Sequence, residues 1–331
     1  MTFKYNQVFV EDAATIAGPY EAKGPLKKYF DQTFDNLYHG EKSWETAEAK
    51  ILEDSIRMLM KKTKKTKEDI DVIISGDLMN QITSSCYSSE KFNFPFLGIY
   101  SACATSVEGM ILGSSLIDGG KVNRAIASTS SHNMSSEKQF RNPTEYGAPK
   151  PKTATFTATG GASILLTNEN TGIKVESSTI GRIVDYEQND PFNMGAVMAP
   201  AAADTIHRHL TDLNRTPDYY DLILTGDLGT YGKEILIDFM KTEYGLDISR
   251  NYNDCGTMLY DLEKQKEVQA GGSGPVCSAL VNYSVVLELL KKKKIKKVLL
   301  VATGALFSPT FVYQHENILS IAHAISLEVI K

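Results

Sequence analysis

The chain has 331 residues, of which 42% are hydrophobic and 23% charged, and its formal net charge is −5 at pH 7. That composition is typical of a globular protein with a large core, and the acidic balance argues against nucleic acid as a partner. No run of about 18 apolar residues occurs, and the first residues lack the apolar centre of a secretory signal, so we expect neither a membrane span nor a signal peptide.

The elements predicted for the first half begin with a helix whose N-cap is Ser43, in "SWETAEAKILEDSIRMLMKKT". The buried strand "DVIISGDL" (71–78) follows, then an apolar segment, a turn of small residues around Cys103, the helix "ACATSVEGMILGSSL" and the strand "RAIASTSS". From 133 to 155, prolines among mixed polar residues predict a long loop instead of a packed helix. "TATFTATGGASILLTN" then predicts a pair of strands around its two glycines.

The second half repeats the first. "DLILTGDL" (221–228) is identical to "DVIISGDL" at five of eight positions, and it too follows a helix, predicted from Ala199 after an ordered loop in "DPFNMGAVMAP". Near-continuous apolar strands between amphipathic helices predict an α/β fold with parallel strands covered on both faces, in two duplicated βαβ halves, 1–170 and 171–331. The site should lie where loops converge at the carboxyl ends of the strands.

Cys103 stands between an apolar segment and a helix, which is how an acyl-transfer enzyme presents its nucleophile. The chain has no CxxC spacing. We therefore expect neither a disulfide framework nor a zinc site, and reduced thiols at most of the cysteines, which besides Cys103 are Cys86, Cys255 and Cys277.

Other polar features have structural interpretations. Asp77 and Asp227 recur at matching positions of the repeat, which favours symmetric capping of the next element over catalysis. The lysine runs "KKTKKTK" (61–67) and "KKKKIKK" (291–297) fit the C-terminal turns of helices. They also fit contact with an anionic membrane surface or an acidic partner.

Cys103 after an apolar segment, the duplicated α/β half and the terminal "ATGAL" strand and loop resemble the thiolase and ketoacyl synthase superfamily. That resemblance implies a layered αβαβα core. At higher specificity the chain resembles the stage V sporulation protein AD family of spore-forming bacteria. The matching stretches span nearly the whole chain in order and include "FPFLGIYSACATS", "QFRNPTEYGAPKP", "DPFNMGAVMAPAAADTI" and "AGGSGPVCSA".

The superfamily resemblance implies four catalytic positions, and only Cys103 keeps the expected residue type. Gly226 falls where condensing enzymes have histidine, Ser273 falls in the turn that carries histidine or asparagine, and Ala302 replaces the second cysteine of thiolases. Proton transfer by such groups contributes on the order of 10²–10⁴ in rate. We therefore expect no enzyme activity and no cofactor. Two alternatives stay open: an acyltransferase in which Cys103 uses a recruited base such as His132, and a pure scaffold for membrane subunits.

The family resemblance also implies a ligand, dipicolinic acid (pyridine-2,6-dicarboxylic acid), the spore-core solute whose transport across the spore inner membrane the family serves. A flat dianion needs N–H or cationic donors and an apolar wall. His132 and Arg141 are chosen for this chemistry and their position along the chain, although His132 also suits a structural role and Arg141 an ion pair with Glu137 or Glu145. The expected pocket residues are Cys103, His132, Arg141, Gly226, Ser273 and Gly304, the last as a match to a superfamily oxyanion donor.

The same resemblance implies a peripheral protein on the cytoplasmic face of the forespore and spore inner membrane. Its expected partners are dipicolinic acid, alone or as a calcium chelate, and the membrane subunits of one transport assembly. The role would be uptake during sporulation, release in germination, or both. The superfamily also implies a homodimer. We expect no metal site of the protein's own and no nucleic acid.

Overall fold

The computed structural model describes residues 1–140 and 150–330. One large sheet runs through the molecule in the strand order β11-β10-β13-β14-β9-β2-β8-β6-β4-β5. Its first-half strands are β2 (Phe9–Ala17), β4 (Val72–Gly76), β5 (Phe96–Gly98), β6 (Arg124–Ser131) and β8 (Gly160–Thr167). Its second-half strands are β9 (Ile173–Thr179), β10 (Leu222–Thr225), β11 (Tyr252–Asp254), β13 (Lys297–Ala305) and β14 (Ser320–Val329).

The two halves of the sheet have the same internal order. In each, a parallel group of three strands continues into an antiparallel pair. Two short strands extend the sheet, β1 (Thr2–Lys4) beside β9 and β3 (Gln32–Thr33) beside β2, while β7 (Phe156–Thr157) and β12 (Gly272–Ser273) form a separate pair. The predicted boundary at 170 and 171 falls in the connection between β8 and β9.

The N-terminal segment belongs to both halves. β1 pairs with β9, the Tyr5 N–H donates to the Glu176 carbonyl at 3.0 Å, and the Val175 N–H donates to the Val8 carbonyl at 2.9 Å. From Phe9 onward the same segment pairs with β8. β1 and β2, the first two strands of the chain, therefore link the two halves of the sheet.

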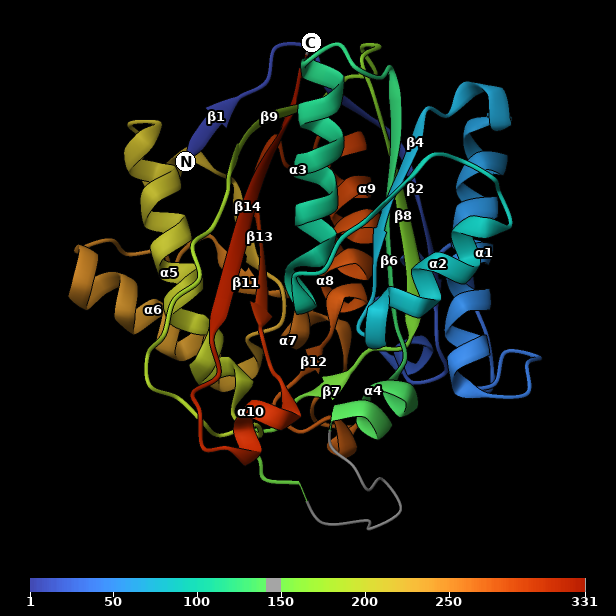
Figure 1. Cartoon of the computed structure of the whole chain (residues 1–331). Coiled ribbons are helices and arrows are strands. Elements are labelled where there is room, and N and C mark those ends of the chain that lie inside the picture. The colour runs from blue at the N-terminus through green and yellow to red at the C-terminus, as the bar shows by residue number, and fades with distance from the viewer. Residues whose placement is uncertain (141–149, 331) are drawn as a thin grey trace.

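Helices form three layers around the two halves of the sheet (Figure 1). The outer layers are α1 (Trp44–Thr63) with α2 (Thr83–Glu90), and α5 (Met194–Asp212) with α6 (Gly229–Tyr244). Between the halves lie α3 (Thr105–Asp118), α8 (Pro275–Val281) and α9 (Leu287–Lys291), the last two joined by a π-helical turn at Asn282–Val286. The predicted α/β fold with a layered αβαβα core is confirmed.

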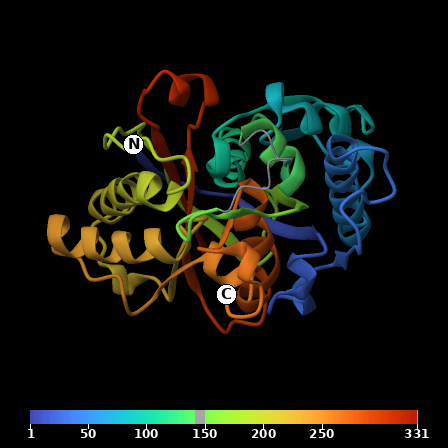
Figure 2. The ribbon, with the colours of Figure 1, turned by 90° about the horizontal axis from the view of Figure 1, so that it is seen from below.

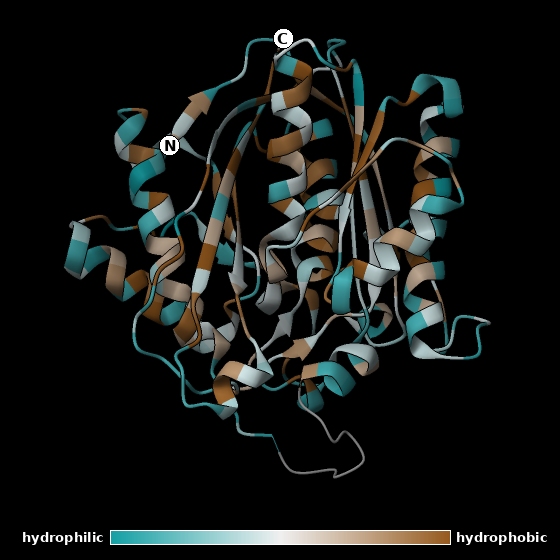
Figure 3. Ribbon diagram, in the orientation of Figure 1, coloured by the Kyte–Doolittle hydropathy of each residue, from teal (hydrophilic) through white to brown (hydrophobic). Residues whose placement is uncertain are grey.

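Apolar residues follow these layers. Hydrophobic colour concentrates on the strands and the central helices, and hydrophilic colour on the exposed sides of the outer helices (Figure 3). The largest buried cluster joins α3 and the α8–α9 helix to strands of both halves. Smaller clusters lie under α5 and under α1. None of the helices in the described residues is both long and apolar enough to cross a bilayer.

Contacts at repeated positions confirm the duplication that the sequence predicts. Ser43 caps α1 by accepting the Thr46 N–H, and Asn193, 150 residues later, caps α5 in the same way. The Asp71 carboxylate accepts the N–H groups of residues 123 and 124 at the start of β6. Asp221 does the same for residues 296 and 297 at the start of β13.

Three local predictions are wrong. The predicted loop 133–155 opens with a helix, α4 (Asn133–Phe140), because its polar side chains are buried against hydrogen-bonding partners and not exposed to water. The predicted pair of strands does not form, since β7 pairs with β12 and β8 with strands of the large sheet. α5 begins at Met194, after the Asn193 cap, and carries Pro200 in its interior, where packing of the buried apolar face of the helix offsets the lost backbone hydrogen bond. The two short remaining helices are α7 (Cys255–Leu259) and α10 (Pro309–Tyr313).

Candidate functional site

The predicted convergence of loops forms a pocket at the carboxyl ends of the parallel strands. These strand ends are at the lower end of Figure 1 and face the viewer in Figure 2. It comprises about 560 Å³ of empty space, part of which is open solvent. Its apolar wall includes Leu78, Tyr100, Phe140, Met194, Met198 and Phe307. Its polar residues are Cys103, Ser136, Glu137, Thr155, Thr157, Asp227 and Ser273.

Cys103 is held at the pocket by a tight turn. A short 3-10 helix, Ala102–Ala104, precedes α3, and Ala102 has a φ of 48°, a left-handed conformation that costs a non-glycine residue energy. β13 supports this turn from behind, because a Cβ built on Gly304 would come within 2.4 Å of the Ser101 carbonyl oxygen. The sulfur therefore stands near the N-terminus of α3, as predicted.

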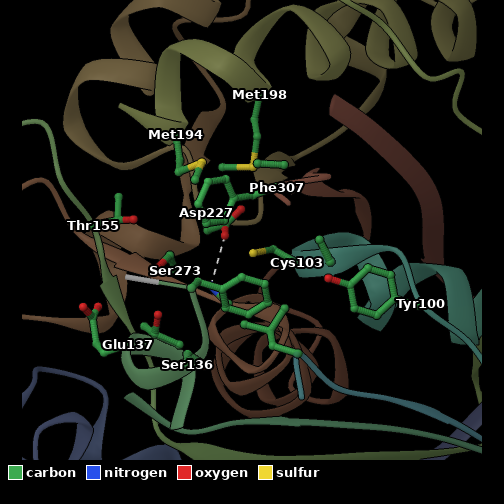
Figure 4. Close-up of a pocket in the computed structure, with 16 residues that line it drawn as sticks. Tyr100, Cys103, Ser136, Glu137, Thr155, Met194, Met198, Asp227, Ser273 and Phe307 are labelled. Atoms are coloured by element: carbon green, nitrogen blue, oxygen red, sulfur yellow. Dashed lines mark hydrogen bonds between the residues drawn. The ribbon is translucent and has the colours of Figure 1, made fainter. Parts of the chain in front are cut away.

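Asp227 is the polar partner of Cys103. Its carboxyl group accepts the Gly274 N–H at 3.1 Å (Figure 4) and the Thr303 hydroxyl at 2.7 Å, and it is hydrogen-bonded to the Cys103 thiol. Burial raises the pKa of Asp227 to about 7, although its hydrogen bonds to Cys103 and Thr303 oppose that rise. The site thus contains a carboxyl group that is partly protonated near neutral pH.

The Cys103–Asp227 pair differs from an activated cysteine. In a cysteine–histidine pair the histidine becomes a cation and stabilises the thiolate. Here an ionised Asp227 would stand beside a second anion, and a neutral Asp227 would give the thiolate no compensating charge. When Asp227 is ionised, the pairing therefore opposes thiolate formation at Cys103.

The rest of the described lining is short of positive charge. Among the lining residues that the structure describes, Asp227 and Glu137 are the only ionisable carboxyl groups, and none is lysine, arginine or histidine. Glu137 forms an ion pair with Lys150, with Nζ 2.8 Å from Oε1. Lys150 thus brings a cation to the pocket wall through Glu137.

The structure brings some predicted residues together and not others. Cys103 and Ser273 line the pocket, and Gly304 supports the Cys103 turn without lining it. Gly226 packs at the end of β10, where an added Cβ would lie 3.2 Å from the Thr303 nitrogen, so the pocket position belongs to the next residue, Asp227. Arg141 lies outside the described residues.

The structure does not bring His132 to the pocket. Its Nδ1 accepts the Met134 N–H at 3.2 Å, so its Nε2–H donates to the Leu37 carbonyl at 2.7 Å. Burial lowers the pKa of His132 to about 4, which keeps the ring neutral. Both ring nitrogens are used to join segments of the fold, and this is the structural role that the sequence left open.

Sequence reasoning missed Asp227 because it assigned that residue to a helix cap. The N–H groups of Leu228 and Gly229 are instead accepted by Asp254, at 2.9 and 3.0 Å. The available signal was the alternation of side chains at a strand end, which places Gly226 and Asp227 on opposite sides. Met194 and Met198 were missed because the first turns of α5 were assigned to a loop.

Comparisons with known proteins agree with this geometry. Among solved structures, an OleA variant of Xanthomonas campestris matches with a TM-score of 0.63 at 11% identity, covering 98% of this chain and 99% of that one. The 3-oxoacyl-[acyl-carrier-protein] synthase III of Aquifex aeolicus matches with a TM-score of 0.58 at 12% identity, covering 97% and 99%. At such identities the likeness shows the fold alone, which is thiolase-like.

Sequence comparison reaches further. Stage V sporulation protein AD of Bacillus subtilis is 47% identical over 321 residues, which cover 97% of this chain and 94% of the relative. The model of the family described as stage V sporulation protein AD matches residues 1–328. The chain therefore belongs to the stage V sporulation protein AD family.

Proposed function

We propose that this chain is a non-catalytic, dipicolinic acid-binding subunit that acts in sporulation. It would serve a transport assembly of the spore inner membrane as a peripheral protein, in uptake of dipicolinate and also in its release at germination. The observation that carries the proposal is the Cys103–Asp227 pair, which replaces an activating base by an acid while the pocket around it stays open. The family match supports the role in sporulation.

The pocket has the chemistry that a flat aromatic diacid requires. Met194, Met198 and Phe307 offer an apolar wall for the ring. Ser273 and Thr157 offer hydroxyl donors for carboxylate oxygens, and a protonated Asp227 can donate as well. We expect the ligand to lie between these polar residues and the methionines.

A second candidate function is acyl transfer through Cys103, with a base recruited from elsewhere. Its support is the position of Cys103 near the N-terminus of α3, together with the fold shared with 3-oxoacyl-[acyl-carrier-protein] synthase III. A pure scaffold for membrane subunits is the third, and it would need no ligand in the pocket. We also propose a homodimer, supported by exposed apolar side chains at and after the edge strand β5, Leu97 and Tyr100.

Titration calorimetry with dipicolinate tests the first proposal. We expect saturable binding by the wild-type protein, at least tenfold weaker binding by Ser273→Ala, which lacks one donor, and weak binding of benzoate, which has one carboxylate. Met198→Trp fills the pocket and should abolish binding, whereas Met58→Leu, on the outer helix α1 and away from the pocket, should not. A folded wild-type protein that shows no saturable binding up to millimolar dipicolinate would contradict the proposal.

Two further measurements separate the alternatives. Incubation with acyl-CoA and intact mass measurement would support the enzyme if a stoichiometric adduct forms and is lost in Cys103→Ala. Normal assembly of Met198→Trp with its membrane subunits, and normal transport by that assembly, would favour the scaffold. An Arg141→Ala variant that binds dipicolinate normally would remove Arg141 from the proposed site.

A further inference from the structure

The two lysine runs, far apart in the sequence, meet on one face of the protein. Lys62, near the end of α1, has its Nζ 3.7 Å from Asp12 Oδ1, and Lys291, at the end of α9, has its Nζ 2.6 Å from the same oxygen. We call the lysines of 61–67 and of 291–296 the basic face. It combines ten of the 35 basic residues of a chain whose formal charge is −5.

Most of this charge has no local partner. Lys62, Lys65, Lys291 and Lys292 pair with carboxylates. Within the described ranges, no acidic side chain comes within ion-pair distance of the other six, Lys61, Lys64, Lys67, Lys293, Lys294 and Lys296. All six are exposed, so their charge is available to a partner.

Completing a helix dipole does not account for them. That effect is confined to the last turn of a helix. α1 ends at Thr63 and α9 at Lys291, so only Lys61 of the six lies within a last turn. The other five follow the helix ends, beyond the turns to which that effect is confined.

The basic face lies opposite the pocket. In Figure 1 the ends of α1 and α9 are at the upper end of the molecule, and α4, β7 and β12, which carry lining residues of the pocket, are at the lower end. β13 runs between the two, from Lys297 beside the basic face to Ala305 in the pocket wall. A strand of that length spans about 26 Å.

We propose that the basic face docks the protein on an anionic lipid bilayer. Both runs use lysine and no arginine, and they carry no aromatic residue. Lysine provides mobile point charges, which suit a fluid layer of headgroups, whereas bidentate phosphate recognition favours arginine and single-stranded nucleic acid favours aromatic stacking. This inference rests on the peripheral membrane role in the proposed function and adds the face of the protein that meets the bilayer. In that orientation the mouth of the pocket points away from the bilayer.

Vesicle sedimentation tests the proposal with the full-length chain. The probes are vesicles of phosphatidylcholine alone and of phosphatidylcholine with phosphatidylglycerol, at low and at high salt. We expect binding only to the anionic vesicles, and its loss as salt shortens the screening length. Lys293→Glu/Lys294→Glu should weaken partitioning at least 25-fold, from about fivefold for each lysine.

A matched control tests whether binding depends on the basic face or only on the net charge of the protein. Lys42→Glu/Lys266→Glu changes the charge equally at two exposed lysines that lie before α1 and between α7 and β12, away from the basic face. We expect it to bind within twofold of the wild-type protein. Equal loss in both variants, unchanged binding by Lys293→Glu/Lys294→Glu, or no binding to anionic vesicles would each overturn the proposal, the last in favour of an acidic protein partner.

Dipicolinate calorimetry on the same variants keeps the two proposals apart. Lys293→Glu/Lys294→Glu should bind dipicolinate like the wild-type protein, because the basic face and the pocket are at opposite ends. If no form of the protein binds dipicolinate while the vesicle results hold, the proposed ligand fails and the docking surface stands. If dipicolinate binds and the vesicles do not, the reverse holds.

Discussion

From the cap of the outer helix to the end of the first parallel strand, the two halves place equivalent residues 150 positions apart, and these pairs show which contacts a duplicated fold keeps. Asp71 and Asp221 still hold the same two N–H groups at the start of β6 and β13. Asp77 and Asp227 start from equivalent strand ends but no longer do the same thing. Asp77 accepts the N–H groups of Met79 and Ser85 around the start of α2, whereas Asp227 faces the pocket.

The difference follows from the neighbouring outer helix. Glu48 of α1 is buried and accepts the hydroxyls of Ser130 and Ser135 at 3.2 and 2.7 Å. Burial, with the nearby Asp77 charge, raises the pKa of Glu48 to about 8. The equivalent residue of α5 is Met198, which lines the pocket. One half thus fills the space beyond its strands with hydrogen-bonded polar groups, and the other leaves it as an open pocket.

The largest expected effect tests whether Asp254, and not Asp227, holds N–H groups in the second half as Asp77 does in the first. We expect Asp254→Ala and Asp77→Ala each to lower the free energy of unfolding by about 4 kcal/mol, because each leaves two buried or partly buried N–H groups without an acceptor. Asp227→Ala should cost about 2 kcal/mol, since solvent in the pocket can replace part of its bonds. Urea unfolding measures all three, and a larger loss in Asp227→Ala than in Asp254→Ala would reverse the assignment.

A second experiment makes the halves more alike. Strand register makes Ser131 of β6 the counterpart of Gly304 of β13. Gly304→Ser should lower the free energy of unfolding by about 3 kcal/mol and abolish ligand binding, because its Cβ would meet the Ser101 carbonyl and displace the Cys103 turn. The reverse change, Ser131→Gly, should cost about 1 kcal/mol, for one lost hydrogen bond to the Ala158 carbonyl. Dipicolinate calorimetry and urea unfolding together would show whether close packing of a strand against the neighbouring turn matters only in the second half.

The pH dependence of stability isolates Asp227. Its folded pKa of about 7 lies above its unfolded value of 3.8, so between these values the folded state binds more protons and stability falls as pH rises. We expect the wild-type protein to lose about 2 kcal/mol more than Asp227→Asn between pH 5 and 7. Urea unfolding at several pH values measures this, and parallel curves would show that Asp227 is ionised in the fold. The contributions of the other buried acids to the pH dependence are the same in both proteins and cancel in the comparison.

The smallest effect concerns the two helix caps. Ser43→Ala should lower the free energy of unfolding by about 1 kcal/mol, and Asn193→Ala by slightly less, because its bond to the Ala196 N–H is longer, at 3.4 Å against 3.2 Å for Ser43. Urea unfolding of both variants checks this order. Ser43→Asn, which keeps a capping side chain, is the control and should stay within a few tenths of a kcal/mol.

The sequence predicts the fold well where a pattern repeats. The capped helix after Ser43, the strands at 71–78 and 221–228 and the turn around Cys103 all have local signals, because burial and capping select residue types directly. α4 escapes prediction because its buried serines and Glu137 are hydrogen-bonded within the fold, so its composition imitates that of an exposed loop. β7 escapes because its partner, β12, lies more than 100 residues away.

The site is predicted less completely for a similar reason. Cys103 and Ser273 could be placed from the turns that hold them, but Asp227 depends on a hydrogen bond that forms only when β10, β13 and the Cys103 turn meet. His132 shows the opposite error. A histidine after a strand looks suited to a ligand, yet the nearby Leu37 carbonyl and Met134 N–H, which the fold supplies, engage both its nitrogens.

The N-terminal segment has a consequence for any attempt to divide the protein. Residues 2–9 are hydrogen-bonded to β9 and residues 9–17 to β8, so a cut between residues 170 and 171 would leave part of the second half's sheet on the first fragment. Neither fragment would be complete by itself. The isolated second fragment would expose the open edge of β9, and the first would carry the strand that closes it. Two such fragments should recover a folded protein by reassociation, as a complemented pair.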